Sequence, residues 1–240
     1  MSGSIGKGGN AAMYISQHQA NSKNERLADP APLAMGGFAT TLLSVSLAMM
    51  NFRDVSTQTL FVGDLCFVAF FGLLISAQWE MVRGNTFSYT VLSAYALFYA
   101  GYGANMIPSF GIIDAYGGYT SEYYNAFGFF ILLWGVFNLF FLIASIRFNL
   151  VYILIFLSLE LCLCFDAASQ FKRGDGRFST SKTFSTVAGA FAFTASILGY
   201  YTVLHYLCEE SLPVSVPMGD TSRYFKKCTL ASGKANDDLV

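Results

Sequence analysis

The chain has 240 residues, of which 54% are hydrophobic, 17% are aromatic and only 12% are charged. Soluble domains carry about twice that share of charged residues, so the composition excludes an ordinary water-soluble fold. Because 14 Lys and Arg residues offset 15 Asp and Glu residues, the net charge of −1 also excludes a basic surface for nucleic acid.

The first 28 residues are polar and rich in Ser, Gly, Asn and Gln, and we expect them to form a disordered cytosolic tail. The chain then becomes apolar. Crossing the ~30 Å hydrocarbon core of a bilayer takes a helix of about 20 apolar residues. The segments that meet this requirement are residues 32–50, 59–82, 86–107, 125–146, 147–168 and 182–207.

These segments are predicted to be helices because their apolar runs are long and lack the two-residue alternation of a membrane β-barrel. A helix also satisfies its own backbone hydrogen bonds in lipid. Arg147 and Asn149 interrupt one apolar stretch, and a turn at this point keeps the charged residue at the membrane surface. The sequence therefore predicts an all-α integral membrane protein, with a six-transmembrane-helix bundle over residues 29–207 and a cytosolic tail over residues 208–240.

The distribution of Lys and Arg residues predicts the orientation of this bundle. With the N-terminus inside, nine cations lie on the inner side and five on the outer side, so the positive-inside rule places both termini in the cytosol. Four cations after the fifth segment oppose this orientation. We expect a multi-pass protein of the plasma membrane that contacts membrane lipid.

Ionisable side chains inside the apolar segments are costly in a membrane, so each needs an explanation. Glu80 lies near the inner end of the second segment, one turn before Arg83, and is either an interfacial residue paired locally or an acid coupled to transport. Asp166 lies near a helix end and is interpreted as interfacial. Glu160 lies near the middle of the fifth segment without a cation in the same turns. It is either an acid that hydrogen-bonds to a neighbouring helix or subunit, or a functional group that couples protons or filters anions.

Residues suited to catalysis or metal binding are not grouped in the sequence. The five cysteines lack metal-ligand spacing, and no nucleophile lies beside a base. We therefore expect no enzymatic activity, no metal and no cofactor.

Two prolines stand where the first apolar helix begins, in the sequence DPAPLAMGGF of residues 29–38. Proline suits the first turn of a helix, and the free N–H groups of a helix start attract a carboxylate. The segment resembles the NPAPLGL signature at the first helix of the acetate uptake transporters, also called succinate–acetate permeases. The residues matching this motif are Asp29, Pro30, Ala31, Pro32 and Leu33. Further similar stretches follow in order at residues 79–99, 107–116, 125–137 and 188–201.

The resemblance implies a six-helix protein that moves acetate or another short monocarboxylate, as a channel or a proton-linked permease, and that assembles as a homo-oligomer of six copies, a hexamer. It also implies a hydrophobic constriction in each copy, at the positions matching Phe38, Tyr95 and Leu159. We expect the Tyr95 hydroxyl to offer a hydrogen bond to the carboxyl group of the solute. Neighbours on a helix point about 100° apart, so Glu160 should point away from the path that Leu159 lines.

The chain departs from the family pattern at several positions. Asp29 replaces an Asn, Ala34 replaces a Gly, Thr202 replaces an Asn, and residues 68–70 are Val-Ala-Phe where the family has Tyr-Gly-Gly. An alternative function is therefore a membrane sensor or scaffold that keeps the fold without transport. The partners expected from the sequence are a small carboxylate, membrane lipid and further copies of the chain.

Overall fold

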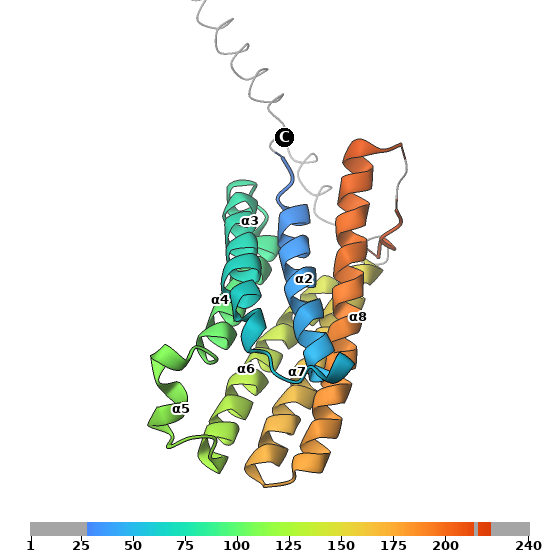
Figure 1. Cartoon of the computed structure of the whole chain (residues 1–240). Coiled ribbons are helices and arrows are strands. Elements are labelled where there is room, and N and C mark those ends of the chain that lie inside the picture. The colour runs from blue at the N-terminus through green and yellow to red at the C-terminus, as the bar shows by residue number, and fades with distance from the viewer. Residues whose placement is uncertain (1–27, 214–215, 222–240) are drawn as a thin grey trace, which may run out of the picture.

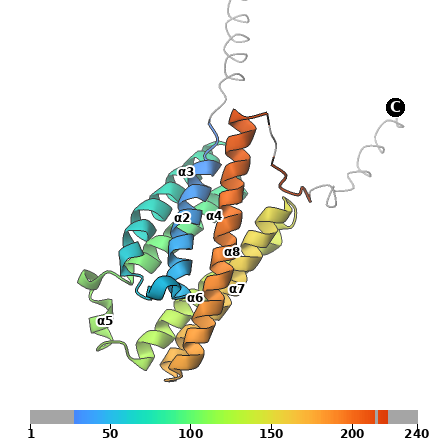
Figure 2. The ribbon, with the colours of Figure 1, turned by 45° about the vertical axis from the view of Figure 1, so that its right-hand side comes forward.

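The computed structural model describes residues 28–213 and 216–221, so most of the two predicted tails lies outside the described residues. Within these ranges every named element is a helix (Figure 1), which confirms the all-α prediction. The long helices lie side by side and run between the two ends of an elongated bundle (Figure 1, Figure 2).

Long helical segments form the bundle, and short elements connect them. The long segments are α2 (Ala31–Met49), Thr59–Val82 ending in α3 (Phe70–Val82), α4 (Thr86–Ala104), α6 (Ser121–Ser145), α7 (Leu150–Gly174) and α8 (Phe178–Ser211). The short elements are η1 (Phe52–Asp54), η2 (Thr59–Phe61), η3 (Asp64–Ala69), η4 (Pro108–Phe110) and α5 (Ile112–Ala115). In the described part of the chain, 5 helices are long and apolar enough to cross a membrane, and these include every long segment except α4.

α4 is long enough to span a membrane, with 19 residues, but no stretch of it is as hydrophobic as the apolar stretches of the other long segments. It contains several Ser and Thr residues as well as tyrosines, of which Tyr95, Tyr99 and Tyr102 are buried. Polar groups are tolerated at membrane depth where they face the interior of a bundle rather than lipid. The lower hydropathy of α4 therefore reflects its position against the interior of the bundle.

The last three helices extend beyond the apolar segments predicted from the sequence. α6 begins at Ser121, where the Thr120 side chain accepts a hydrogen bond from the Tyr123 N–H at 3.3 Å. The turn predicted before the fifth segment is present, and Asn149 caps the start of α7 through the Tyr152 N–H at 2.8 Å. Hydropathy locates the part of a helix that lies in hydrocarbon, whereas capping side chains decide where the helix begins.

α2 packs against α3 on one side and α8 on the other. Its contact with the π-helix η3 requires a small residue, because a Cβ on Gly37 would lie 2.9 Å from the Val68 carbonyl oxygen. Thr41 Oγ1 also donates a hydrogen bond to the Asp64 carbonyl at 3.2 Å. π-Helical turns occur frequently at functional sites. α2 therefore holds the irregular start of the second segment in place.

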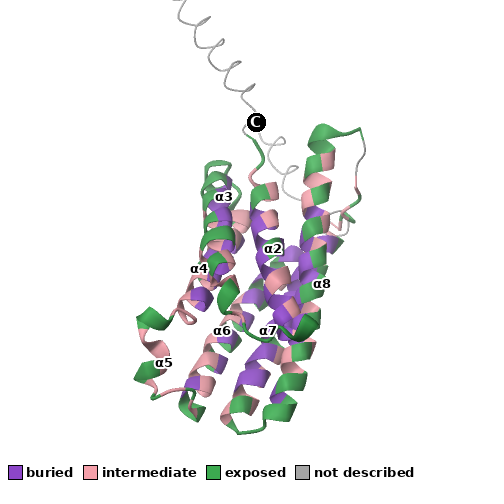
Figure 3. Cartoon of the chain, in the orientation of Figure 1, coloured by how far each residue is buried: buried purple, intermediate pink, exposed green. Residues whose placement is uncertain are grey.

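α7 packs between α6 and α8, and α4 packs against α3. Aromatic side chains join α4 to α6: the ring centroids of Phe98 and Phe130 lie 6.0 Å apart, and those of Phe98 and Trp134 lie 5.3 Å apart. Buried residues gather on the inside of the bundle and exposed residues on its outside (Figure 3). Large hydrophobic residues such as Leu133 and Phe140 are among the exposed residues. Such residues suit lipid or another copy of the chain.

Candidate functional site

Three cavities follow one another from the start of α2 to its end. The proximal cavity, with a volume of about 260 Å³, has Asp29 and Tyr206 among its lining residues. The middle cavity has a volume of about 50 Å³. The distal cavity, with a volume of about 570 Å³, is lined by Asn51 and other residues at the opposite end of the bundle. Tyr95 and Leu159 line both the proximal and the middle cavity.

The middle and distal cavities also share wall residues, namely Met49, Tyr102 and Asp166. Two sets of side chains therefore separate three spaces that follow the bundle axis. A small solute that moves between the two ends through these cavities passes Tyr95 and Leu159, and then Tyr102 and Asp166. The three cavities together define the candidate path.

The residues predicted for the constriction lie together on the proximal cavity. Phe38, Tyr95 and Leu159 are all lining residues of that cavity and are each less than 10% exposed. The Phe38 and Tyr95 rings meet edge to face, with centroids 6.3 Å apart. These side chains come from α2, α4 and α7, so three helices must keep their spacing to hold the wall together.

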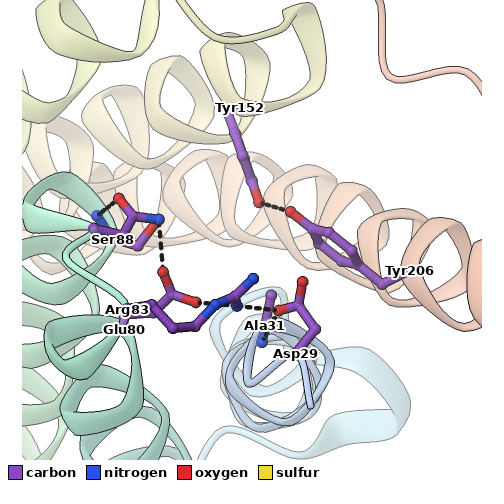
Figure 4. Close-up of polar contacts among 8 residues, drawn as sticks. Asp29, Ala31, Glu80, Arg83, Ser88, Tyr152 and Tyr206 are labelled. Atoms are coloured by element: carbon purple, nitrogen blue, oxygen red, sulfur yellow. Dashed lines mark hydrogen bonds and ion pairs between the residues drawn. The ribbon is translucent and has the colours of Figure 1, made fainter. Parts of the chain in front are cut away.

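An ion-pair cluster stands at the mouth of the proximal cavity (Figure 4). Arg83 Nη1 lies 3.1 Å from Asp29 Oδ1 and 2.9 Å from Glu80 Oε1. Asn85 Nδ2 donates to Glu80 Oε2 at 2.6 Å. Glu80 is only 3% exposed, and both of its oxygens accept hydrogen bonds from neighbours on the same connection. Glu80 is therefore paired locally while it lines the cavity.

Only some residues of the predicted motif at the start of α2 line this cavity. Asp29 and Ala31 line it, whereas Leu33 is 57% exposed and is not among the lining residues. Pro30 is the N-cap of α2, and Pro32 lies in its first turn, as the sequence predicts. The helix start was expected to attract the carboxylate of a solute, but Asp29 Oδ1 itself accepts from the Ala31 N–H at 2.9 Å. The Asp in place of the family's Asn thus links α2 to Arg83.

Two tyrosine hydroxyls face the ion-pair cluster across the cavity mouth (Figure 4). The Tyr152 and Tyr206 oxygens lie 2.9 Å apart, and both residues line the proximal cavity. In such a pair one hydroxyl donates to the other, so the second proton stays available to a third group. The sequence gives no signal for this pair, because a tyrosine in an apolar helix usually packs in the core.

The Tyr95 hydroxyl does not offer its proton to the cavity, contrary to the expectation from the sequence. It donates to Asn138 Oδ1 at 2.5 Å, and Asn138 is 1% exposed. Asn138 Nδ2 in turn donates to the Phe156 carbonyl at 3.0 Å and to Glu160 Oε2 at 2.7 Å. Glu160 thus hydrogen-bonds to a neighbouring helix and is not a lining residue of any of the three cavities.

Asp166 was interpreted as interfacial because it was expected near a helix end; the expected helix end is wrong, and the interfacial role stays a prediction. Asp166 is 7% exposed, accepts from Gln170 Nε2 at 3.3 Å, and lies in the wall between the middle and distal cavities. The misplacement arises because α7 continues to Gly174, well past the end of its apolar segment. Arg173 and Lys182 line the distal cavity as well. Among the described residues, no group of His, Cys, Asp and Glu could hold a metal ion.

Comparison with known proteins gives consistent matches over most of the chain. The sequence profile of the GPR1/FUN34/yaaH family matches residues 13–218. Acetate transporter protein patA from Penicillium expansum is 36% identical over 218 residues, which cover 88% of this chain and 88% of that protein. The protein of the same name from Aspergillus clavatus is 37% identical over 201 residues, covering 84% and 81% of the two chains. The structure of the bacterial acetate channel SatP covers 81% of this chain and 100% of its own, with a TM-score of 0.66 and 22% identity, which shows a shared fold.

Proposed function

Since the chain belongs to the GPR1/FUN34/yaaH family, we propose that it carries acetate or another short monocarboxylate across a membrane. The observation that carries this proposal is the series of three cavities interrupted by the wall of Phe38, Tyr95 and Leu159. The apolar wall accommodates a methyl group, and the tyrosine pair at the proximal mouth offers a proton to a carboxyl group.

The wall between the proximal and middle cavities favours a proton-linked mode of transport. Moving an ionised carboxylate without compensating partners into apolar surroundings is strongly unfavourable, whereas a neutral acid costs far less. The solute therefore crosses the wall with a proton. In this proposal Glu80 and Glu160 are structural acids, because each is held by fixed neighbours.

We also propose a homo-hexamer in the plasma membrane, with residues 29–207 as its transmembrane domain and both tails in the cytosol. The start of α2 and the end of α8 lie at the same end of the bundle (Figure 1), which supports tails on one side. The outward hydrophobic faces of the helices, which include Leu133 and Phe140, supply surface for lipid and for other copies. Mass measurement in nanodiscs that finds only a monomer would contradict the hexamer.

Transport is tested by uptake of radiolabelled acetate into liposomes that hold the purified chain. The assay uses a pH at which nearly all acetate is ionised, so that diffusion of the acid through lipid is slow. We expect faster initial uptake than in protein-free liposomes, and a loss of that excess when Leu159→Trp fills the wall between two cavities. Uptake equal to that of protein-free liposomes would instead favour the sensor or scaffold function.

A further inference from the structure

A chain of buried hydrogen bonds leads from the path to a carboxylate behind it. Tyr95 on α4 donates to Asn138 on α6, and Asn138 donates to Glu160 on α7. Asn138 is nearly inaccessible, with 1% exposure, and is the residue that joins the three helices. A polar side chain inside a membrane bundle is retained where its partners are fixed.

The orientation of the Asn138 amide follows from its neighbours. The Phe156 carbonyl oxygen lies 3.0 Å from Asn138 Nδ2, and a backbone carbonyl accepts but never donates. The amide nitrogen must therefore face Phe156, and the amide oxygen must face Tyr95. Glu160 adds a second acceptor on the nitrogen side at 2.7 Å. The Tyr95 hydroxyl is consequently the donor in its bond to Asn138.

Because the Tyr95 hydroxyl donates its proton to Asn138, it is not free to donate to a solute at the wall. The other side chains at this level, Phe38 and Leu159, have no polar atoms, and Phe156 beside them is also apolar. An anion that leaves water here loses its hydrogen bonds and gains none in return. A neutral acid carries its own proton and needs no donor from the wall.

We propose that Asn138 is a positioning residue that makes this wall selective for undissociated acids, an inference that rests on the proposed transport of a short monocarboxylate. Asn138 does so by binding the Tyr95 proton, and Glu160 assists by fixing the amide. The solute class is therefore the neutral monocarboxylic acid of acetate size. Without Asn138, the Tyr95 hydroxyl is free to rotate and to donate to a carboxylate in the path.

The test measures whether acetate uptake carries charge. Liposomes holding the full chain are clamped at a set membrane potential with potassium and valinomycin, without a pH gradient. We expect wild-type uptake to be independent of potential. Uptake by Asn138→Leu should respond several-fold, approaching the roughly tenfold effect that about 60 mV has on one full charge.

Further variants separate this role from a merely structural one. Tyr95→Phe added to Asn138→Leu removes the freed hydroxyl, so uptake should become independent of potential again. Ser145→Ala, on the same helix, removes a hydroxyl that donates to the Leu142 carbonyl at 2.7 Å; it serves as the matched control and should behave as wild type. If Asn138→Leu fails to fold, Asn138→Ser replaces it, because the shorter side chain cannot reach Tyr95.

Two outcomes would overturn the inference alone: wild-type uptake that depends on potential, or uptake by a folded Asn138 variant that stays independent of it. Failure of Tyr95→Phe to reverse the effect would also overturn it, because Asn138 would then act by another route. An absence of any protein-dependent uptake would remove the proposed function, and this inference with it.

Discussion

The two ends of the candidate path differ in charge and in the freedom of their charged groups. The proximal cavity is lined by two carboxylates and one cation, namely Asp29, Glu80 and Arg83. The distal cavity is lined by two cations and one carboxylate, namely Arg173, Lys182 and Asp166. The lining charges therefore sum to −1 at one end and +1 at the other.

The opposite lining charges favour different interactions with an anionic solute at the two ends. A wide mouth with an excess of cations raises the local concentration of anions and speeds their arrival. At the proximal mouth, Arg83 is the cation among the described lining residues, and it is held by two carboxylates, so it is not free to pair with an anion. In the transport that we propose, the distal end collects the ionised solute, the wall of Phe38, Tyr95 and Leu159 passes its neutral form, and the proximal end does not retain it.

The largest effect expected concerns stability at the proximal mouth. Arg83→Leu leaves Glu80 buried without its cation, and we expect unfolding to become easier by about 2 kcal/mol, a factor of roughly thirty. Thermal unfolding in detergent measures this. Lys172→Ala, which breaks the more exposed pair with Asp175 at 3.0 Å, is the matched control and should cost less than about 0.5 kcal/mol. Equal losses in the two variants would show that the proximal pair has no special role.

The next effect concerns the collection of anions at the distal mouth. Reversing both cations, with Arg173→Glu and Lys182→Glu, should lower initial acetate uptake from that side roughly tenfold at low salt. High salt should reduce the difference, because it screens exposed charges. Arg177→Glu reverses one cation, which is half of that charge change, at an exposed position outside the distal cavity. If Arg177→Glu slows uptake as much as the double variant, the local mouth is not what attracts the anion.

A several-fold effect is expected at the wall that divides the two ends. Leu159→Ala removes three carbons from the wall and should raise uptake of lactate-sized acids, while acetate uptake changes little. Competition of unlabelled acids against labelled acetate measures the range of solutes accepted. An unchanged range in Leu159→Ala, together with abolished uptake in Glu160→Gln, would reverse the assignment of these two faces of α7.

The smallest effect on uptake is expected at Glu160, which lies behind the wall and bonds to Asn138. Glu160→Gln keeps an acceptor for Asn138 but replaces a charge-assisted hydrogen bond with a neutral one, so stability should fall by about 1 kcal/mol. Acetate uptake should stay within about twofold of wild type, since a side-chain carbonyl still fixes the amide. Thermal unfolding and uptake are measured on the same sample, and a loss of uptake without a loss of stability would contradict this role.

The helices could be predicted from the sequence because each apolar run is long enough to identify a span. The shared wall of Phe38, Tyr95 and Leu159 was reached only through the family resemblance. In a membrane bundle both the packed face and the lipid face of a helix are apolar, so periodicity does not tell which residues converge. For the same reason the Tyr152–Tyr206 pair could not be predicted.

Asn138 could have been found from the sequence, because it is a polar residue within the apolar run LLWGVFNLFFL and such residues need a partner in lipid. Its partner Tyr95 could not, since the two are 43 residues apart and lie on different helices. The position of Asp166 was missed because hydropathy gives the end of an apolar run rather than the end of a helix.

The adjacent glycines of α2, Gly36 and Gly37, differ in the space that the fold leaves for a side chain. Around Gly36 nothing lies within 4 Å of a built Cβ, whereas at Gly37 that atom would meet the backbone oxygen of Val68 at 2.9 Å. A backbone oxygen cannot rotate aside as a side chain can, so even alanine at position 37 displaces the π-helix. A library that randomises both codons should therefore recover many residues at position 36 and glycine alone at position 37. Of these two glycines, Gly37 is therefore the one for which the neighbouring backbone leaves no room for a side chain.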